Sequence, residues 1–289
     1  MRVFVTGATG FIGSAIVQEL LGAGHRVLGL ARSEAGAKAV AAAGAEVHRG
    51  SLEDLDSLKS GAATVDGVIH TAFIHDFTDF AANAQKDQAA IEAMAAALAG
   101  SNKPLIVSSG CLGIRTEEDA APHAFPRKSE AAALAAVAHG VRGVVIRLAP
   151  SVHGDGDHGF VPALIKSARE RGQASYVAEG QNQWPAVHRL DAAVLYRLAL
   201  EKGVAGARYH GAADEGIPTR RIVEFIAQRL NVPAVSVTAE QAAEQLGFIG
   251  RVLGMGGATS STLTQERLGW RPTHPGLIQD LEQGTYFDT

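Results

Sequence analysis

The sequence is poor in the features that mark secreted, membrane-bound and nucleic-acid-binding proteins. Its 289 residues include one cysteine, Cys111, so no disulfide can form within the chain. No apolar run approaches the roughly 20 residues of a membrane span, and the N-terminus lacks the apolar core and cleavage site of a signal peptide. Acidic residues outnumber basic ones, 30 to 26, and no basic cluster indicates nucleic acid. We therefore expect a cytoplasmic protein with neither a membrane nor a nucleic-acid partner.

The first half of the chain alternates short β-rich runs with alanine-rich helical stretches. Strands are predicted over Val3–Thr6, Arg26–Leu30, Ala45–His48, Gly67–His70, Leu105–Ser108 and Gly143–Leu148. The helices between them are predicted over Phe11–Leu21, Ala35–Ala43, Leu52–Lys59 (with Ser51 as its N-cap), Ala81–Ala99 and Ser129–His139. This alternation predicts an α/β fold, a doubly wound parallel sheet of the Rossmann type with helices on both faces.

The turn after the first predicted strand carries a glycine pattern, GATGFIG at residues 7–13, that opens the first helix. The first glycine permits a tight turn, the second lets the backbone approach a pyrophosphate, and the third allows close packing of helix and strand. The phosphates then lie at the positive end of the helix. Because the pattern lies within a β-α-β unit, we expect a dinucleotide to bind there. The predicted contacts are Gly7, Thr9, Gly10, Phe11, Ile12 and Gly13.

The end of the second predicted strand indicates which dinucleotide binds. An NAD enzyme carries an acid about 20 residues after the glycines, where it binds the ribose 2′-hydroxyl. Ala31 fills that position here and is followed by Arg32 and Ser33. A guanidinium forms paired hydrogen bonds with a phosphate, and a hydroxyl adds another. We therefore predict NADP(H) as the cofactor, with Arg32 and Ser33 at its 2′-phosphate; an Arg32 that is merely solvated is the alternative.

After Pro150 the alternation gives way to a glycine-rich loop at residues 154–159 and to helices separated by short, irregular strands. The helices predicted here are Phe160–Arg171, Leu190–Leu200, Thr219–Leu230 and Ala239–Leu246. We expect residues 1–150 to form the NADP(H)-binding Rossmann domain. Residues 151–289 are expected to form a smaller substrate-binding lobe, not an independent domain, over the carboxyl edge of the sheet, where open α/β sheets bind ligands.

Several segments resemble those of the short-chain dehydrogenase/reductase superfamily, in particular its extended and atypical subgroups, which include sugar-nucleotide epimerases and dehydratases. Residues 5–13, VTGATGFIG, match the TGxxGxxG pattern of that family, and residues 147–154, RLAPSVHG, resemble its RPxxVYG stretch. The resemblance implies cofactor contacts beyond the glycine loop. They fall on the adenine side at Ser51 and Leu52, near the nicotinamide ribose at Thr71, Ala72 and Phe73, and on the nicotinamide side at Pro150.

The resemblance breaks down at the catalytic helix. The family's serine corresponds to Ser109, after the fifth strand, but a Tyr-x-x-x-Lys is expected at the start of the next helix. This chain has PHAFPRKSE there, at residues 122–130, and then an alanine-rich run. Its four tyrosines all lie in the C-terminal half, at Tyr176, Tyr196, Tyr209 and Tyr286. The usual proton donor is therefore missing, and Lys128 has no tyrosine to serve.

Histidine is a reasonable replacement as proton donor because it titrates near neutral pH. His153 occupies the tyrosine position of the RPxxVYG stretch, and His188 precedes a helix that Asp191 is expected to cap. We predict Ser109, His153 and His188 as catalytic residues, with Ser109 donating a hydrogen bond to a substrate oxygen. A purely structural role is the alternative for each, and His158 in the glycine-rich loop is a weaker candidate. The histidine spacings match no metal-ligand set, so no metal is expected.

Three functions are compatible with these residues. The first is an NADP(H)-dependent oxidoreductase that reduces a small carbonyl or imine compound by hydride transfer. The second is a non-catalytic NADP(H)-binding sensor or scaffold, which the missing tyrosine supports. The third is a sugar-nucleotide epimerase or dehydratase, which the missing tyrosine disfavours because that chemistry needs a base for a hydroxyl proton. The expected partner is a small-molecule substrate, and a homodimer is an open alternative to a monomer.

Overall fold

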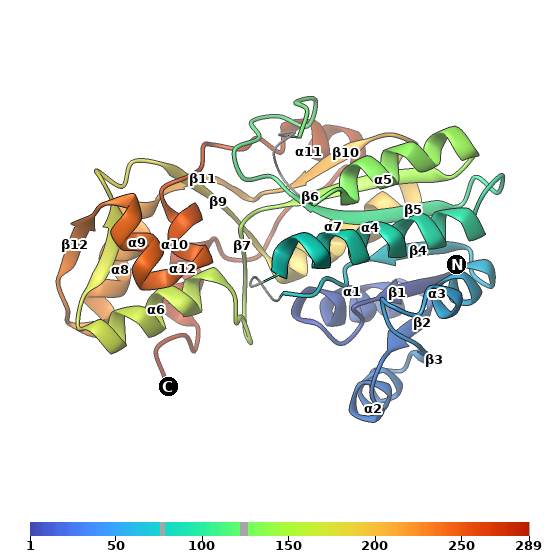
Figure 1. Ribbon diagram of the computed structural model, residues 1–289, viewed down its shortest axis with the longest axis horizontal. Coiled ribbons are helices and arrows are strands. Elements are labelled where there is room, and N and C mark those ends of the chain that lie inside the picture. Colours follow the sequence, from blue (N-terminus) through green and yellow to red (C-terminus); the bar gives the residue numbers. More distant parts are fainter. Residues whose placement is uncertain (76–78, 122–126, 289) are drawn as a thin grey trace.

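Seven parallel strands form the main sheet of the computed structural model, which describes residues 1–75, 79–121 and 127–288 (Figure 1). In spatial order they are β10 (Arg208–Gly211), β6 (Arg142–Leu148), β5 (Pro104–Gly110), β4 (Gly67–His70), β1 (Arg2–Thr6), β2 (Arg26–Ala31) and β3 (Glu46–Arg49). The strand order reverses between β1 and β4, which are hydrogen-bonded neighbours. This doubly wound arrangement confirms the predicted fold class, and ligands bind such sheets at the carboxyl ends of the strands beside the reversal.

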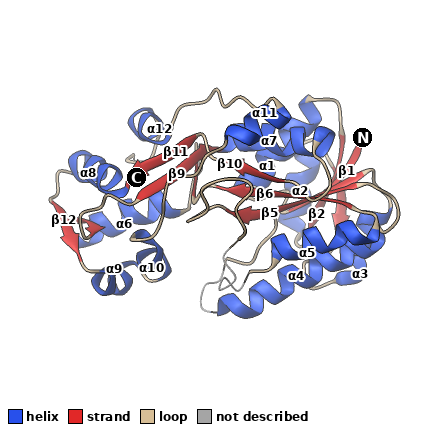
Figure 2. Ribbon diagram, turned by 90° about the horizontal axis from the view of Figure 1, so that it is seen from above, coloured by secondary structure: helices blue, strands red, loops and turns tan. Residues whose placement is uncertain are grey.

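Helices cover both faces of this sheet (Figure 2). They are α1 (Phe11–Gly22), α2 (Glu34–Ala42) and α7 (Arg189–Lys202) on one face, and α3 (Leu55–Ala63), α4 (Phe80–Ala97) and α5 (Ser129–Ala135) on the other. Successive side chains of a strand point to opposite faces, so Val5 and Ile69 pack in the first layer and Phe4 and Val68 in the second. Burial on both faces is why these strands are continuous apolar runs in the sequence.

The start of α3 differs from the sequence prediction. The helix begins at Leu55 rather than Leu52, because the Asp54 carboxylate accepts a hydrogen bond from Ser57 N (3.0 Å) and caps it. Ser51 lies in the turn before this cap, so its prediction as the N-cap is wrong.

The cap of α7 also differs. His188 Nδ1 accepts a hydrogen bond from Leu190 N (3.3 Å), so His188 is the N-cap and the prediction that Asp191 fills this role is wrong. The Asp191 carboxylate instead accepts hydrogen bonds from the backbone N–H groups of Thr273 (3.0 Å) and His274 (3.1 Å). It therefore fastens the C-terminal segment to α7.

The second lobe lies to the left in Figure 1 and has its own core. Its strands are β7 (Ser151–His153), β9 (Gln183–His188) and β11 (Asp214–Pro218) in one sheet, and β8 (Ala174–Val177) and β12 (Ala234–Val237) in another. Its helices are α6 (Phe160–Arg171), α8 (Thr219–Leu230), α9 (Ala239–Leu246), α10 (Phe248–Leu253) and α12 (Leu277–Gln283). Trp184 and Ile226 are almost completely buried among these elements, so the lobe is held together by apolar packing of its own.

The chain returns from this lobe to the main sheet. α7 packs against α1, and β10 pairs with β6 as the edge strand of the main sheet. α11 (Thr262–Leu268) contacts α7 and β10, and Trp270 Nε1 donates to the Asp191 carbonyl (2.9 Å). Residues 189–211 therefore belong to the body of the main sheet, so the predicted division at residue 150 does not separate the two bodies along the chain.

A buried charge network joins α5 to the main sheet. Arg147 of β6 has no exposed surface and donates to both carboxylate oxygens of Glu130, from Nε (2.8 Å) and Nη2 (2.7 Å). Arg208 of β10 donates to the same carboxylate (2.7 Å). Burial alone would raise the pKa of Glu130, but the hydrogen bonds from Arg147 and Arg208 hold that pKa below its usual range. The ionised carboxylate therefore ties three elements together.

We expect Glu130→Gln to lower the free energy of unfolding by about 3 kcal/mol, because it leaves the buried Arg147 without its counter-charge. Urea unfolding at pH 7 measures the loss, and Glu118→Gln, which removes an exposed pair with Arg267, is the control at under about 1 kcal/mol. The pKa of Glu130 is lower in the folded protein than in the unfolded chain, where it is about 4.3. The difference in unfolding free energy between wild type and Glu130→Gln is therefore largest above about pH 4.3 and shrinks as the pH falls through the folded pKa. Equal stabilities of Glu130→Gln and wild type at pH 7 contradict this account.

Candidate cofactor-binding and active site

The turn between β1 and α1 brings backbone against backbone. Gly7 has a φ of +71°, and a Cβ there would lie 2.7 Å from Thr71 Oγ1 and 2.8 Å from Ala72 N, just after β4. A Cβ at Gly13 would lie 1.9 Å from the Gly7 carbonyl oxygen. A Cβ at Gly10 would lie 3.2 Å from the same oxygen. No side chain fits at the first two positions, so this packing requires the glycines of the sequence pattern.

The N-terminus of α1 is open to an anion. Gly10 is its N-cap, no side chain caps it, and no acidic residue lies in its first turn. Thr9 and Gly10 are exposed, and Phe11 and Ile12 are half-buried. Backbone N–H groups and the helix dipole favour a phosphate at such an end. The cradle therefore fits the pyrophosphate of a dinucleotide.

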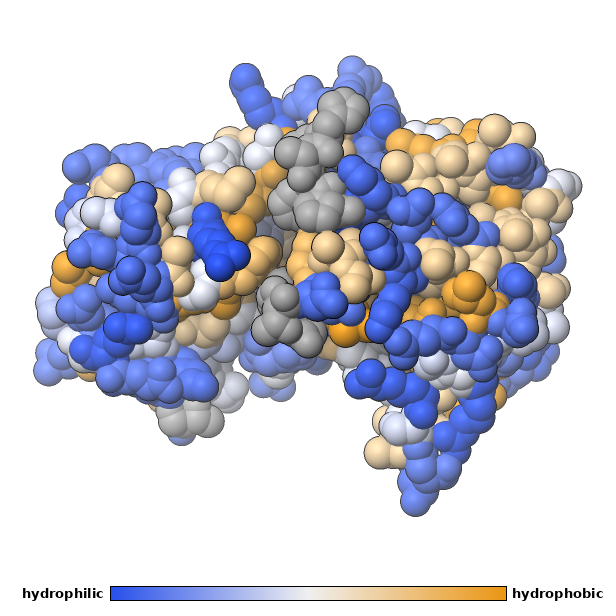
Figure 3. Space-filling model, in the orientation of Figure 1, coloured by the Kyte–Doolittle hydropathy of each residue, from blue (hydrophilic) through white to orange (hydrophobic). Residues whose placement is uncertain are grey.

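Two basic residues meet this turn, His158 from the loop before α6 of the second lobe and Arg189 from the start of α7. The His158 ring meets the Phe11 ring edge-on, with 5.7 Å between centroids, and the Arg189 guanidinium lies 5.1 Å from the centroid of the same ring. Figure 3 shows apolar side chains on both sides of the junction between the lobes. The glycine turn therefore lies where the two bodies meet.

The end of β2 carries a cation and no acid. Ala31 is buried, whereas Arg32 is exposed and forms no ion pair within the described ranges. Arg49 on the adjacent β3 is paired with Glu34. Ser33 caps α2 by accepting a hydrogen bond from a backbone N–H of its first turn (3.1 Å). Arg32 is thus available to a phosphate, while the nearest acid along the chain is bound to another arginine.

The other predicted cofactor contacts also follow the carboxyl ends of strands. Thr71 Oγ1 donates to the Thr6 carbonyl (2.8 Å) and Ala72 N to the Thr6 hydroxyl (3.4 Å), so both are held beside the end of β1. Phe73 comes next and is half-buried. Half-buried residues also occupy the remaining positions, Ser51 and Leu52 after β3 and Pro150 after β6. The structure therefore brings Thr71 and Ala72 against the glycine turn, and the cofactor contacts themselves stay predictions.

The two serines at the end of β5 face opposite sides of the sheet. Ser108 is buried against α7, where its Oγ donates to the His70 carbonyl (2.8 Å) and lies 2.7 Å from Tyr196 Oη. Ser109 therefore faces the side that carries α4 and α5. It is half-buried and forms no hydrogen bond with its side chain among the described residues. Its hydroxyl is available to a ligand.

The two histidine candidates lie together but are buried. His153 has no exposed surface; its Nδ1 donates to Asp280 (2.8 Å), and its Nε2 has no hydrogen-bond partner among the described residues. Its ring meets that of His188 at 5.4 Å, and His188 stacks on His274 at 4.7 Å. Burial, followed by repulsion from His153 and His274, lowers the pKa of His188 below its usual range. This environment therefore disfavours the protonated form of His188.

No tyrosine of the described chain, which includes all four, takes the place of the missing one. Tyr196 is buried, and its hydroxyl forms a hydrogen bond with the Ser108 hydroxyl. Tyr286 Oη accepts a hydrogen bond from Gly154 N (2.9 Å) and lies 3.2 Å from Asp157 Oδ2. Burial raises the pKa of both hydroxyls, and the Asp157 charge adds to the rise at Tyr286. Neither is poised to release a proton near neutral pH.

Arg127 borders this region, and no motif in the sequence predicted it. Its guanidinium lies 4.2 Å from the centroid of the Phe73 ring, and its Nη2 donates to the Ser108 carbonyl (3.2 Å). The signal that could have found it is its position directly before α5, where the family's Tyr-x-x-x-Lys is expected. Residues 122–126 of that same stretch lie outside the described residues.

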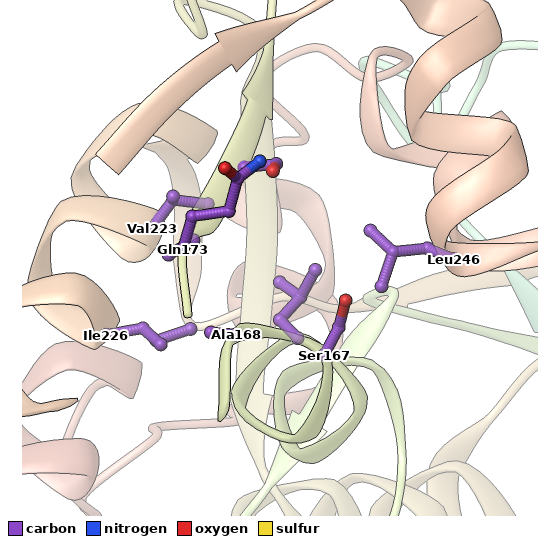
Figure 4. Close-up of a pocket in the computed structure, with 9 residues that line it drawn as sticks. Ser167, Ala168, Gln173, Val223, Ile226 and Leu246 are labelled. Atoms are coloured by element: carbon purple, nitrogen blue, oxygen red, sulfur yellow. The ribbon is translucent and has the colours of Figure 1, made fainter. Parts of the chain in front are cut away.

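Other features of the described chain provide no ligand site. A pocket in the second lobe is lined in part by Ser167, Gln173, Val223, Ile226 and Leu246 (Figure 4). Its free volume of about 10 Å³ holds about one water molecule. Among the described residues, no group of three or more His, Cys, Asp or Glu side chains could hold a metal ion. No helix of this part of the chain is long and apolar enough to cross a membrane.

Comparison with known proteins identifies the family. The model of the NAD dependent epimerase/dehydratase family matches residues 3–119. "Uncharacterized protein C2A9.02" of Schizosaccharomyces pombe is 49% identical over 99% of this chain and 100% of its own length. "Uncharacterized protein YLL056C" of Saccharomyces cerevisiae is 42% identical over 97% and 98% of the two chains. This chain therefore belongs to the NAD-dependent epimerase/dehydratase family, of the extended short-chain dehydrogenase/reductase type, which confirms the resemblance seen in the sequence.

More distant proteins carry activities in their names. The 4-hydroxy-2-methyl-3-oxo-4-farnesyl-3,4-dihydroquinoline-1-oxide ketoreductase of Stigmatella aurantiaca is 26% identical over 86% of this chain and 80% of its own. The solved structure of DesIV, a dTDP-glucose 4,6-dehydratase of Streptomyces venezuelae with NAD and TYD bound, has a TM-score of 0.77 over 98% of this chain and 96% of that chain, at 20% identity. At that identity the likeness shows the fold. The family is NAD(P)-dependent; the binding of its dinucleotide at the glycine turn of this chain stays a prediction.

We expect Gly13→Ala to abolish the close packing of α1 and with it the binding of the dinucleotide, because the new Cβ would overlap the Gly7 carbonyl oxygen. A loss of at least about 2 kcal/mol of stability accompanies such backbone displacement. Gly22→Ala in the same helix is the control: nothing lies within 4 Å of its added Cβ, and we expect a gain of up to about 1 kcal/mol. Thermal unfolding with and without NADPH measures the stability and the cofactor binding of both variants. If Gly13→Ala has the stability and NADPH binding of wild type, the proposed phosphate cradle is wrong.

Proposed function

We propose that this protein is an NADP(H)-dependent oxidoreductase that reduces a small carbonyl or imine compound by hydride transfer. The observation that carries the proposal is the exposed Arg32 after β2, where an NAD-preferring enzyme has an acid and where no described residue pairs with the guanidinium. A 2′-phosphate would form paired hydrogen bonds with Arg32, and the Ser33 hydroxyl lies one residue away along the chain.

The chain offers residues that could bind the substrate heteroatom and supply its proton. When bound, NADPH supplies a hydride to the carbon of a C=O or C=N bond, and the heteroatom takes up a proton. We assign Ser109 to hold that heteroatom, because its hydroxyl is available at the carboxyl end of β5, at the ligand-binding edge of the sheet. His153 and His188 are kept as the proposed proton donors. Since both are buried, their proton has to reach the substrate through water.

The surroundings of the tyrosines distinguish between the alternative functions. A sugar-nucleotide epimerase or dehydratase needs a base for a hydroxyl proton, and the described tyrosines give none, whereas the Stigmatella relative is a ketoreductase by name. The second candidate is a non-catalytic NADP(H)-binding sensor or scaffold, which the bonded hydroxyl of Tyr196 favours. A small-molecule substrate, a cytoplasmic location and a homodimer as alternative to a monomer stay predictions.

The test of the cofactor proposal is Arg32→Glu. A carboxylate there repels the 2′-phosphate, so we expect NADPH binding to weaken by about 1–3 kcal/mol relative to NADH binding. Fluorescence titration with each cofactor measures the preference. Lys166→Glu in the exposed part of α6 makes the same change of net charge in the other lobe and leaves the preference as in wild type. If Arg32→Glu keeps the wild-type NADPH-to-NADH ratio, the assignment of Arg32 is wrong.

A further inference from the structure

Arg127 is held at the carboxyl edge of the sheet by hydrogen bonds on one side of its guanidinium. Its Nε donates to Ser129 Oγ (2.7 Å) and lies 3.6 Å from Asp87 Oδ2, and its Nη2 donates to the Ser108 carbonyl (3.2 Å). The side chain is 19% exposed, so it lies mostly inside the protein but reaches solvent. These contacts fix the plane of the guanidinium.

Behind Arg127 lies a buried polar network that keeps its counter-charge ionised. Asp87 of α4 is 1% exposed; it accepts hydrogen bonds from His70 Nε2 (3.1 Å) and from Ser129 Oγ. His70 Nδ1 in turn lies 2.7 Å from Thr6 Oγ1. Burial would raise the pKa of Asp87, but the hydrogen bond and charge interaction with His70, and then the charge of Arg127, hold it below its usual range. A charged, multiply bonded Asp87 makes Arg127 a pre-oriented donor rather than a mobile surface group.

One nitrogen of Arg127 is left for a ligand. The hydrogen bonds described above use Nε and Nη2, and no residue of the described ranges accepts one from Nη1. Ser109 faces the same side of the sheet as Ser129 and Asp87, because Ser108 points to α7. Nη1 and the Ser109 hydroxyl are therefore two donors without a described acceptor on one side of the sheet, beside residues 71–73.

The neighbouring wall is aromatic. Phe73 lies under the Arg127 guanidinium and 5.7 Å from the Phe80 ring of α4, which stacks at 6.1 Å on Phe248 of α10 in the second lobe. A chain of rings thus runs from the end of β4 across to the other lobe. Such a surface favours an apolar or aromatic body over a sugar.

We propose that Arg127 is a catalytic residue that binds the oxygen of a carbonyl substrate with an apolar or aromatic body. This inference rests on the proposed function. The carbonyl carbon would accept a hydride from bound NADPH, which would be oxidised to NADP⁺ as its own C–H bond breaks, and the electron pair of the C=O π bond would move to the oxygen. The guanidinium stabilises the developing negative charge but keeps its own proton, so the proton that completes the alcohol arrives through water from the proposed histidine donors.

Binding of benzoate, a planar carboxylate, to the NADP⁺-saturated protein tests the site, with benzamide as the uncharged match. Calorimetry is expected to show tighter binding of benzoate than of benzamide to wild type. Arg127→Met is expected to weaken benzoate binding at least about tenfold while NADP⁺ affinity stays within about twofold, and Arg127→Lys is expected to retain part of the affinity. Arg220→Met is the control, since Arg220 also lies over an aromatic ring, Tyr176 at 5.3 Å, but in the second lobe.

Each outcome separates this inference from the proposed function. Equal benzoate affinity in wild type and Arg127→Met overturns the role of Arg127 and leaves the reductase proposal standing. Failure of wild type to prefer benzoate over benzamide overturns it as well, and this comparison needs no variant, so it decides the case if Arg127→Met does not fold. Absence of NADP⁺ binding to wild type overturns the proposed function instead.

Discussion

At the end of β1 the chain turns so tightly that the backbone of α1 lies directly on the carbonyl of Gly7, and the site depends on this contact. A Cβ at Gly13 would come within 1.9 Å of that oxygen, so only glycine lets the helix start there. The contact sets the position of the N-terminus of α1 beside residues 71 and 72 of the neighbouring strand end. It also places Phe11 where His158 and Arg189 of the second half of the chain meet it. The phosphate cradle and the junction of the lobes therefore share one origin.

The parallel sheet then gathers polar residues at its carboxyl edge. Thr6, His70 and Ser109 lie at the carboxyl ends of β1, β4 and β5 on the face that carries α4 and α5, and Asp87 and Ser129 approach them from those helices. Buried polar groups of this kind are stable only when each finds partners. The network meets that requirement internally for His70 and Asp87, while Ser109 and one nitrogen of Arg127 have no acceptor among the described residues. We propose that the substrate binds at these donors, which the packing leaves unpaired.

The sequence predicted the parts of the fold whose signal is local. The strand Gly67–His70 and the helices Phe160–Arg171, Thr219–Leu230 and Ala239–Leu246 agree with the structure, because apolar periodicity and buried strand runs decide them. The cap of α3 was predicted at Ser51 because a serine precedes an apolar residue there, but Asp54 offers its carboxylate closer to the helix. The pairing of β10 with the main sheet could not be predicted from its own residues. A four-residue strand can pair with any free sheet edge, so its partner is decided by the tertiary structure.

The candidate site divides in the same way. Gly7, Gly13 and Arg32 belong to a pattern of residue types at fixed spacing along the chain. Their proposed roles could therefore be predicted from the sequence. The burial of His153 and His188 could not, because it comes from Asp280 and His274, more than eighty residues away along the chain. Arg127 was missed because its partners come from one strand and two helices and form no motif in the sequence.

The most direct test of the account is titration calorimetry of the purified protein with NADPH and with NADH. The account predicts a single site per chain that binds NADPH at least about tenfold more tightly, since one guanidinium–phosphate contact is worth more than about 1.4 kcal/mol. The absence of heat with both dinucleotides would contradict it.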